Sequence, residues 1–303
     1  MKRERIADSV GQGRLLVSDG AWGTLLQQQG MAAGECPEQW CLTHPSAVEG
    51  IARSYAEAGA DMVETNSFGA TRFKLAPYGL ADKVAAINEA AASLSRRGAG
   101  ADRWVIASVG PTGKMLLMGD VTREELYEAF REQVVALAKG GADAICIETM
   151  SDIDEACAAI CAAKEHTPLE VIATFTFSRT ALGEFRTMMG LAPDEAARQA
   201  VAAGADIVGA NCGNGMEGMA HIVAEMRRAA PTVPILVHAN AGLPQQVDGA
   251  TVFPESPEQM SDRLGKVVEA GASIVGGCCG TTPAHIRAIK QWALRHPHGN
   301  ALS

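Results

Sequence analysis

Short apolar runs recur along the chain, and four of them follow the same tripeptide. Gly-Ala-Asp, or Gly-Ala-Ser in the last case, begins at Gly59, Gly141, Gly204 and Gly271, at intervals of about 60–80 residues. One strand and its helix take about 30–40 residues, so each interval holds two such units and the tripeptide marks every second strand. Glycine can end a helix in the left-handed conformation, and a small alanine lets the chain turn tightly into the strand.

The remaining strands lie between these marks. All the runs are short and apolar without polar alternation, which is typical of parallel strands buried on both faces. The predicted strands are Leu15–Ser18, Met62-Val63, Trp104–Val109, Ala144–Ile147, Val171–Phe175, Ile207-Val208, Ile235–His238 and Ile274-Val275. Helices are predicted between them, for example Thr122–Lys139, where Thr122 and Glu125 form a capping-box pattern, and Pro193–Ala203.

Eight strands alternating with helices predict an α/β protein with a (β/α)8 TIM barrel. An open, doubly wound sheet is the competing architecture. The fourfold recurrence favours the barrel, because in a closed ring each repeat meets the same surroundings. No linker-like segment or shift of composition interrupts the chain, so residues 1–303 are predicted to form a single domain.

Composition narrows the function. Apolar residues make up 47 % of the 303 residues, and the formal net charge of −9 argues against nucleic acid as the main partner. No apolar run reaches the length of a membrane span, and no apolar segment follows the charged start of the chain as in a secretory signal. We therefore expect a cytoplasmic protein without a membrane partner.

Polar side chains cluster where the predicted strands end, which is where TIM barrels hold their active sites. Segments of this kind are Asp19–Thr24, Glu64–Gly69, Glu148-Thr149, Asn211–Asn214, Asn240–Gly242 and Gly276–Gly280. The strands beneath them are apolar, so the ends of the strands are the expected location of the chemistry.

Three cysteines follow the even-numbered sixth and eighth strands. Cys212, Cys278 and Cys279 would converge at a similar height in the barrel, and three thiolates suit Zn²⁺ with one coordination position open. Free cysteines are also often small buried apolar residues, and both interpretations stay open from spacing alone. The other five, namely Cys36, Cys41, Cys146, Cys157 and Cys161, we interpret as packing residues.

Two carboxylates stand at strand ends. Glu148 ends an apolar run, where a charge is costly unless it is paired. It is either an anchor for a cationic group such as an amine or one side of a salt bridge. Asp19 has the same two interpretations, or caps the helix beginning near Gly23. His238 is interpreted as a packed residue, and Thr282 before Pro283 as a helix cap.

The motifs together resemble the homocysteine S-methyltransferase family, and most closely the homocysteine-binding modules of cobalamin-dependent methionine synthases. The matching motifs run in the family's order from residue 15 to about 290, and they are Asp19–Thr24, Cys36-Pro-Glu, Glu64–Thr71, Asn211–Gly213, Asn240–Pro244 and Gly276–Pro283. One departure is Ala239, where the methionine synthases often carry proline, which puts the shape of that loop in question.

The resemblance implies a role for each site residue. Cys212, Cys278 and Cys279 would hold Zn²⁺, and Asn240 would lie near the metal and fill its fourth position when substrate is absent. Asp19 and Glu148 would bind the amino group of homocysteine. Backbone amides near Gly20 and the turn Thr65-Asn66-Ser67 would bind its carboxylate.

Zinc chemistry agrees with methyl transfer to sulfur. A free thiol is mostly protonated at neutral pH, whereas zinc coordination deprotonates it. A centre already holding three thiolates is a poor Lewis acid for water but keeps a bound sulfur electron-rich. We therefore expect a methyltransferase that forms methionine from homocysteine.

Alternatives remain at this stage. A zinc hydrolase or lyase is disfavoured because no His-x-His pair is present, and a non-catalytic thiol-binding subunit would share the same cysteines. We expect the methyl donor to be a methylcorrinoid such as methylcobalamin, carried by a partner protein or domain. Donors of the S-methylmethionine or betaine type, and a thiol other than homocysteine, are the other options.

Overall fold

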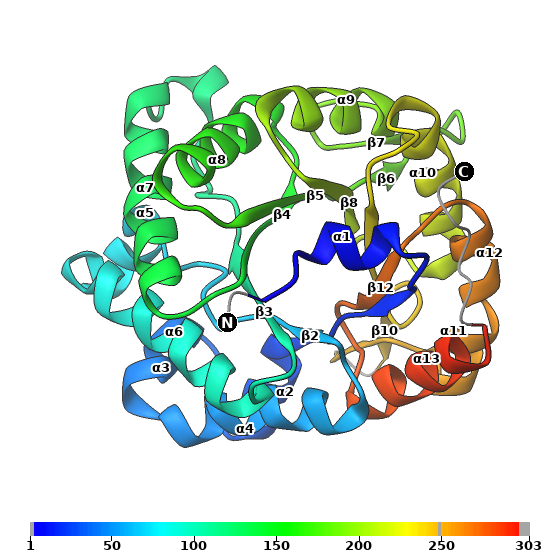
Figure 1. Cartoon of the computed structure of the whole chain (residues 1–303). Coiled ribbons are helices and arrows are strands. Elements are labelled where there is room, and N and C mark those ends of the chain that lie inside the picture. Colours follow the sequence, from blue (N-terminus) through cyan, green and yellow to red (C-terminus); the bar gives the residue numbers. More distant parts are fainter. Residues whose placement is uncertain (1–2, 248–249, 297–303) are drawn as a thin grey trace.

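The computed structural model describes residues 3–247 and 250–296, and its largest sheet holds eight parallel strands in the order β1-β12-β9-β8-β5-β4-β3-β2. The Asp61 N–H donates to the Val17 carbonyl across 2.7 Å, which joins β2 to β1 and closes the ring seen in Figure 1. The predicted (β/α)8 barrel is confirmed. The barrel strands are β1 (Leu16–Val17), β2 (Met62–Val63), β3 (Trp104–Val109), β4 (Ala144–Met150), β5 (Glu170–Phe175), β8 (Ile207–Asn211), β9 (Ile235–Ala239) and β12 (Ile274–Gly277).

Helices surround the barrel strands in Figure 1. They are α1 (Ile6–Gly11), α2 (Trp22–Gln28), α3 (Trp40–Thr43), α4 (Pro45–Ala58), α5 (Arg72–Leu75), α6 (Val84–Ala99), α7 (Arg123–Lys139), α8 (Ile153–His166), α9 (Pro193–Ala203), α10 (Met216–Ala229), α11 (Pro257–Asp262), α12 (Leu264–Glu269) and α13 (Pro283–Arg295). Both predicted helices are confirmed, and so are the capping box at Thr122 and the helix cap at Thr282. In the described part of the chain, no helix has the length and apolar character needed to cross a membrane.

Helix α1 closes one end of the barrel. Figure 1 shows it lying across the ring of strands. Ile6 and Val10, four residues apart, pack against strand residues that include Leu16, Met62 and Ile106 at the amino ends of their strands. This plug was not predicted from the sequence. The opposite end of the barrel, where the strands finish, is thereby left as the place for a site.

The recurring Gly-Ala-Asp tripeptide has a structural purpose at the plugged end. The Asp61 carboxylate accepts a hydrogen bond from the Val17 N–H, and Asp143 and Asp206 do the same for the N–H groups of Val105 and Val171. Each aspartate thus ties the start of its own strand to the preceding barrel strand. Each also pairs with a basic side chain from a helix, respectively Lys290, Arg96 and Lys164.

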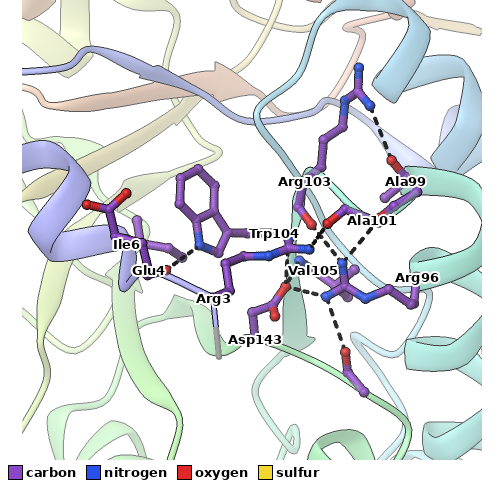
Figure 2. A network of polar contacts seen from close by, with 12 residues as sticks. Arg3, Glu4, Ile6, Arg96, Ala99, Ala101, Arg103, Trp104, Val105 and Asp143 are labelled. Carbon is purple, nitrogen blue, oxygen red and sulfur yellow. Dashed lines mark hydrogen bonds and ion pairs between the residues drawn. The ribbon is translucent and has the colours of Figure 1, made fainter. Parts of the chain in front are cut away.

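The N-terminal arm adds to one of these ties, as Figure 2 shows. Arg3 lies 3.2 Å from the Asp143 carboxylate, which also binds Arg96, and the Trp104 indole donates to the Glu4 carbonyl. Arg5 pairs with Asp206 at 2.8 Å. These contacts hold α1 against the barrel, because the arm leads directly into that helix.

Two short hairpins extend the loops at the open end. One joins β6 (Ser178–Arg179) to β7 (Phe185–Arg186) after β5, and the other joins β10 (Gln245–Val247) to β11 (Ala250–Val252) after β9. Both follow the carboxyl end of a barrel strand, so they border the mouth. Neither was predicted from the sequence.

Candidate active site

Three cysteine sulfurs meet at the mouth of the barrel. Cys212 follows β8, and Cys278 and Cys279 follow β12. Their Sγ atoms all lie within 4.8 Å of one another, and those of Cys212 and Cys279 are 3.8 Å apart. Zinc–sulfur bonds of about 2.3 Å at tetrahedral angles place two sulfurs about 3.8 Å apart. The three side chains therefore fit a zinc ion.

The pKa values of the three thiols also agree with a cation between them. Hydrogen bonds from Cys278 and Cys279 lower the pKa of Cys212 to about 3. The resulting thiolate raises the pKa of Cys279 to about 11 and that of Cys278 well above its ordinary value. Without a cation the cluster holds one negative charge, so full deprotonation of all three requires a positive ion between them.

The backbone around the trio is tightly constrained. A Cβ on Gly277 would collide with Oγ1 of Thr281, so only glycine fits before the cysteine pair. That same hydroxyl donates to the Cys278 carbonyl and accepts from the Ala21 N–H, which ties the eighth strand end to the first. The turn is thus held from both sides.

Asn240 follows β9 beside the trio and is 3 % exposed. Its side chain is one of the hydrogen-bonding groups that lower the Cys212 pKa, and its Oδ1 atom is buried without a partner among the described residues. A buried unpaired oxygen at this position is suited to a cation or a substrate group.

Three buried carboxyl groups lie on the other side of the same mouth. Asp19, Glu64 and Glu148 stand at the ends of β1, β2 and β4 and are each at most 8 % exposed. None of them forms an ion pair with a described lysine or arginine. Burial raises the pKa values of Asp19 and Glu148 to about 7, and raises that of Glu64 further with help from the neighbouring carboxylates. A ligand group carrying positive charge would compensate these buried carboxyl groups.

Hydrogen bonds orient two of these carboxyl groups. The Trp22 indole and the Glu64 N–H donate to Oδ2 of Asp19 at 2.9 and 2.8 Å. Glu148 accepts from the Ser108 hydroxyl and, at 3.1 Å, from Nδ2 of Asn211. The salt-bridge interpretation of Glu148 is therefore not what the structure shows, and Asp19 is not a helix cap, because α2 begins after Ala21.

His238 and Glu64 add a feature that the sequence reasoning missed. Nδ1 of His238 lies 3.5 Å from Oε1 of Glu64, and ligand atoms of Glu64, Glu148 and His238 fall within 4.8 Å of one another. Burial lowers the pKa of His238 to about 4, so the ring is neutral at physiological pH. The sequence offered a signal for Glu64, since a carboxylate directly follows an apolar strand there as well.

The turn after β2 lies beside these carboxyl groups. The Thr65 and Ser67 hydroxyls are 2.6 Å apart, and Ser67 donates to the Ser108 carbonyl. The Asn66 side chain donates to the Pro37 carbonyl. Side chains of the turn are thus occupied, whereas the backbone N–H groups of Gly20 and Asn66 donate to no other described residue.

A cavity of about 320 Å³ connects the groups. It is lined by Gly20, Thr65, Asn66, Glu148 and the three cysteines among others, while Asp19, Ser67 and Asn240 are not part of its lining. Thiols, buried carboxyl groups and free amides therefore face one space large enough for an amino acid.

The other cysteines lie elsewhere. Cys36 is buried in the loop between α2 and α3, Cys41 is buried within α3, Cys146 is buried within β4, and Cys157 and Cys161 are half-buried on α8.

This combination of a (β/α)8 barrel and a cysteine trio at its mouth matches one family. The family model described as homocysteine S-methyltransferase matches residues 16–293, so the chain belongs to the homocysteine S-methyltransferase family, a family of transferases. The resemblance inferred from the motifs is confirmed.

Individual relatives refine this assignment. The chain is 34 % identical over 297 residues to methionine synthase of Mycobacterium tuberculosis and 33 % identical over 296 residues to that of Mycobacterium leprae. These alignments cover 91 % of this chain but 24 % of each relative, so the chain spans about a quarter of their length. The metallated form of the homocysteine methyltransferase MmuM from Escherichia coli has the same fold, with a TM-score of 0.78 at 24 % identity over 94 % of this chain and 98 % of that one.

Proposed function

We propose that this chain binds Zn²⁺ through Cys212, Cys278 and Cys279, binds homocysteine beside it, and transfers a methyl group to the homocysteine sulfur to form methionine. The observation that carries the proposal is the placement of three mutually close Sγ atoms and the buried carboxyl groups of Glu64 and Glu148 around one cavity, with the buried Asp19 bonded to the Glu64 N–H behind them. Residues 1–303 act as one barrel unit in this proposal.

Each end of homocysteine has a complement in the cavity. Asp19 and Glu148 bind the ammonium group, with the Glu64 carboxyl group beside them in the cavity wall, because these buried carboxyl groups lack a lysine or arginine partner among the described residues. The free N–H groups of Gly20 and of Asn66, in the turn Thr65-Asn66-Ser67, bind the carboxylate. The substrate thiol then points toward the cysteine trio, where Oδ1 of Asn240 is available in the absence of substrate.

Zinc bound by the trio would supply one chemical effect, namely stabilising the substrate sulfur as a thiolate at neutral pH. The protein positions that sulfur for in-line attack on the methyl carbon. The sulfur–carbon bond forms, the bond between methyl and donor breaks with its electron pair left on the donor, and the thiol proton goes to solvent.

We assign the methyl donor to a methylcorrinoid such as methylcobalamin on a partner protein or domain. Small ammonium or sulfonium donors are commonly held by aromatic faces, and Trp22 and Phe68 are the aromatic residues lining the cavity in the described structure. Phe177, the third aromatic residue near the strand ends, is buried. The chain also spans about a quarter of its methionine synthase relatives, which is consistent with a methyl carrier outside it. We place the reaction in the cytoplasm, because all eight cysteines are free thiols.

Metal analysis tests the first half of the proposal. The purified protein should contain about one zinc per chain, and Cys278→Ser should lose most of it, since removing one ligand weakens such sites by orders of magnitude. Cys161→Ser, on the outer helix α8, is the matched control and should retain its zinc. Full zinc in Cys278→Ser would refute the cysteine site. A second zinc equivalent abolished by Glu148→Gln would instead assign the Glu64, Glu148 and His238 cluster to a metal.

A donor comparison tests the second half. Zinc-loaded protein and homocysteine are incubated separately with free methylcobalamin, S-methylmethionine and betaine, and methionine is measured. Methionine from methylcobalamin supports the corrinoid assignment, even at a low rate, because the partner that orients the donor is missing. Fast turnover with S-methylmethionine or betaine alone would replace the donor, and no methionine from any of them, together with no binding of homocysteine, would reject the methyltransferase proposal.

A further inference from the structure

The side chain of Asn211 is the meeting point of three barrel strands. It lies at the end of β8 and is 1 % exposed, and each of its two polar side-chain atoms forms two hydrogen bonds. Its Oδ1 accepts from the Thr149 N–H at 2.7 Å and the Thr174 hydroxyl at 2.8 Å, and its Nδ2 donates to Glu148 at 3.1 Å and to the Thr149 hydroxyl oxygen at 2.7 Å. An amide with two donors and one acceptor atom is therefore fully satisfied here.

The hydrogen bond between Asn211 and the Thr149 N–H lies at an irregularity in the sheet. Strand β4 pairs with β5 regularly up to Ile147 and Ala173, and then resumes at Met150 and Phe175, so β4 carries one extra residue. Bulges of this kind redirect side chains next to active sites. Oδ1 of Asn211 takes the Thr149 N–H at this point, so the amide stabilises the bulge that begins next to Glu148.

Backbone strain marks the same place. Thr149 and Cys212 have φ angles of 61° and 58°, and no other non-glycine residue in the described ranges has a positive φ. Threonine in this region is a clear outlier, and such residues persist where their surroundings hold them firmly. Both the main-chain N–H and the hydroxyl of Thr149 are hydrogen-bonded to the Asn211 side chain, and Cys212 directly follows Asn211 in the sequence.

We propose that Asn211 is a positioning residue that fixes the distance between Glu148 and Cys212 and thereby selects the length of the amino thiol. The inference rests on the proposed function, in which Glu148 binds the ammonium end and the cysteine trio receives the thiol end. One amide touches the first of these groups and immediately precedes the second in the chain, so the spacing between them is rigid. A ligand one methylene shorter, such as cysteine, is then expected to bind more weakly than homocysteine.

The test compares homocysteine and cysteine binding in Asn211→Asp. This isosteric change keeps an oxygen for Thr149 and Thr174 but removes the donor to Glu148 and sets two carboxylates against each other. We expect the dissociation constant of homocysteine to rise about tenfold or more, the loss expected for a charge-assisted hydrogen bond. Cysteine should be affected less, so the preference for homocysteine falls, while zinc stays near one per chain.

Asn214→Asp is the matched control. Asn214 is a buried asparagine in the same loop, and it donates to the Phe177 carbonyl rather than to Glu148. Its variant is expected to lose thermal stability without changing the ratio of homocysteine to cysteine affinity. A merely structural role of Asn211 would give the same pattern as Asn214, and that result would overturn the proposal.

The double variant Asn211→Asp with Glu148→Gln covers the case in which the single variant does not fold. It exchanges donor and acceptor, since the introduced glutamine amide can donate to the introduced aspartate, and it keeps the number of buried carboxyl groups unchanged. Its homocysteine preference should match that of Glu148→Gln alone. Failure to recover that preference would contradict the positioning role, whereas wild-type protein that binds no homocysteine would reject the proposed function instead.

Discussion

Asp19→Asn isolates the cost of a buried charge at the mouth of the barrel. The introduced amide can keep every hydrogen bond of the carboxylate, since its oxygen still accepts from Trp22 and Glu64 and its NH₂ group can donate to the Ser18 hydroxyl. The change therefore removes the charge and little else.

The sign of the effect follows from the raised pKa of Asp19. Burial raises it from 3.8 to about 7, so between these values the folded protein holds a proton that the unfolded chain has released. Stability of the ligand-free protein therefore falls as the pH rises through this window. From pH 5 to pH 8 the loss is about 3 kcal/mol, because it accrues at about 1.4 kcal/mol per pH unit until the pH reaches the folded-state pKa.

Thermal unfolding of metal-free wild type and Asp19→Asn between pH 5 and pH 8 measures this effect. An unfolding entropy of about 2.1 cal/mol/K per residue converts about 3 kcal/mol into roughly 4–5 °C for a chain of this length. The melting temperature of the variant, relative to wild type, should rise by that amount from pH 5 to pH 8. The Asp19 charge also raises the pKa values of Glu64 and Glu148, so its removal weakens their pH dependence in the variant and adds to the difference with the same sign.

Homocysteine should reverse the order of thermal stability of wild type and Asp19→Asn at pH 8. In the proposed binding mode the ammonium group of homocysteine compensates the Asp19 charge of wild type, so saturating homocysteine should stabilise wild type more than the variant at pH 8. A difference in melting temperature that is constant from pH 5 to pH 8 would refute the reasoning, because it would mean that Asp19 does not titrate in this range.

Two further predictions concern the frame of the site. Asp143→Ala removes the acceptor of the Val105 N–H and the partner of Arg96. It should lower the free energy of unfolding by about 2–3 kcal/mol and the melting temperature by roughly 3–5 °C. Ser273→Ala, in the repeat that lacks the carboxylate, is the control and should change the melting temperature little. Gly277→Ala drives a Cβ into the Thr281 hydroxyl that holds the Cys278 turn, so the zinc content should fall. Gly265→Ala, whose Cβ would have ordinary contact with Trp292, is the control and should retain its zinc. Equal zinc content in the two variants would contradict this account.

Much of the barrel was predictable because the information is local. Each barrel strand is a short apolar run, and the Gly-Ala-Asp tripeptide repeats because each copy meets the same neighbours. The meeting of Cys212 with Cys278 and Cys279 also followed from strand order, since the carboxyl ends of all strands lie at one end of a barrel.

The features that were missed depend on contacts between distant segments. Six residues of α1 gave too short a pattern to predict a helix, and their role as a plug is visible only against the closed ring. Asn211 was part of a recognised motif, but its bonds to Glu148 and Thr149 join residues more than 60 positions apart. The bulge in β4 falls at Glu148 and Thr149, after the apolar run Ala144–Ile147 that predicted the strand, so that run gives no sign of it.

The plug formed by α1 has a kinetic consequence. With one end of the barrel sealed by Ile6 and Val10, the amino acid substrate, the product and the methyl carrier of the proposed reaction must all share the opposite opening. A carrier of protein size seated over that opening blocks the passage of the amino acid. Homocysteine must then load before the carrier arrives, and methionine must leave after it departs, so steady-state kinetics with such a carrier should show a compulsory order with homocysteine first.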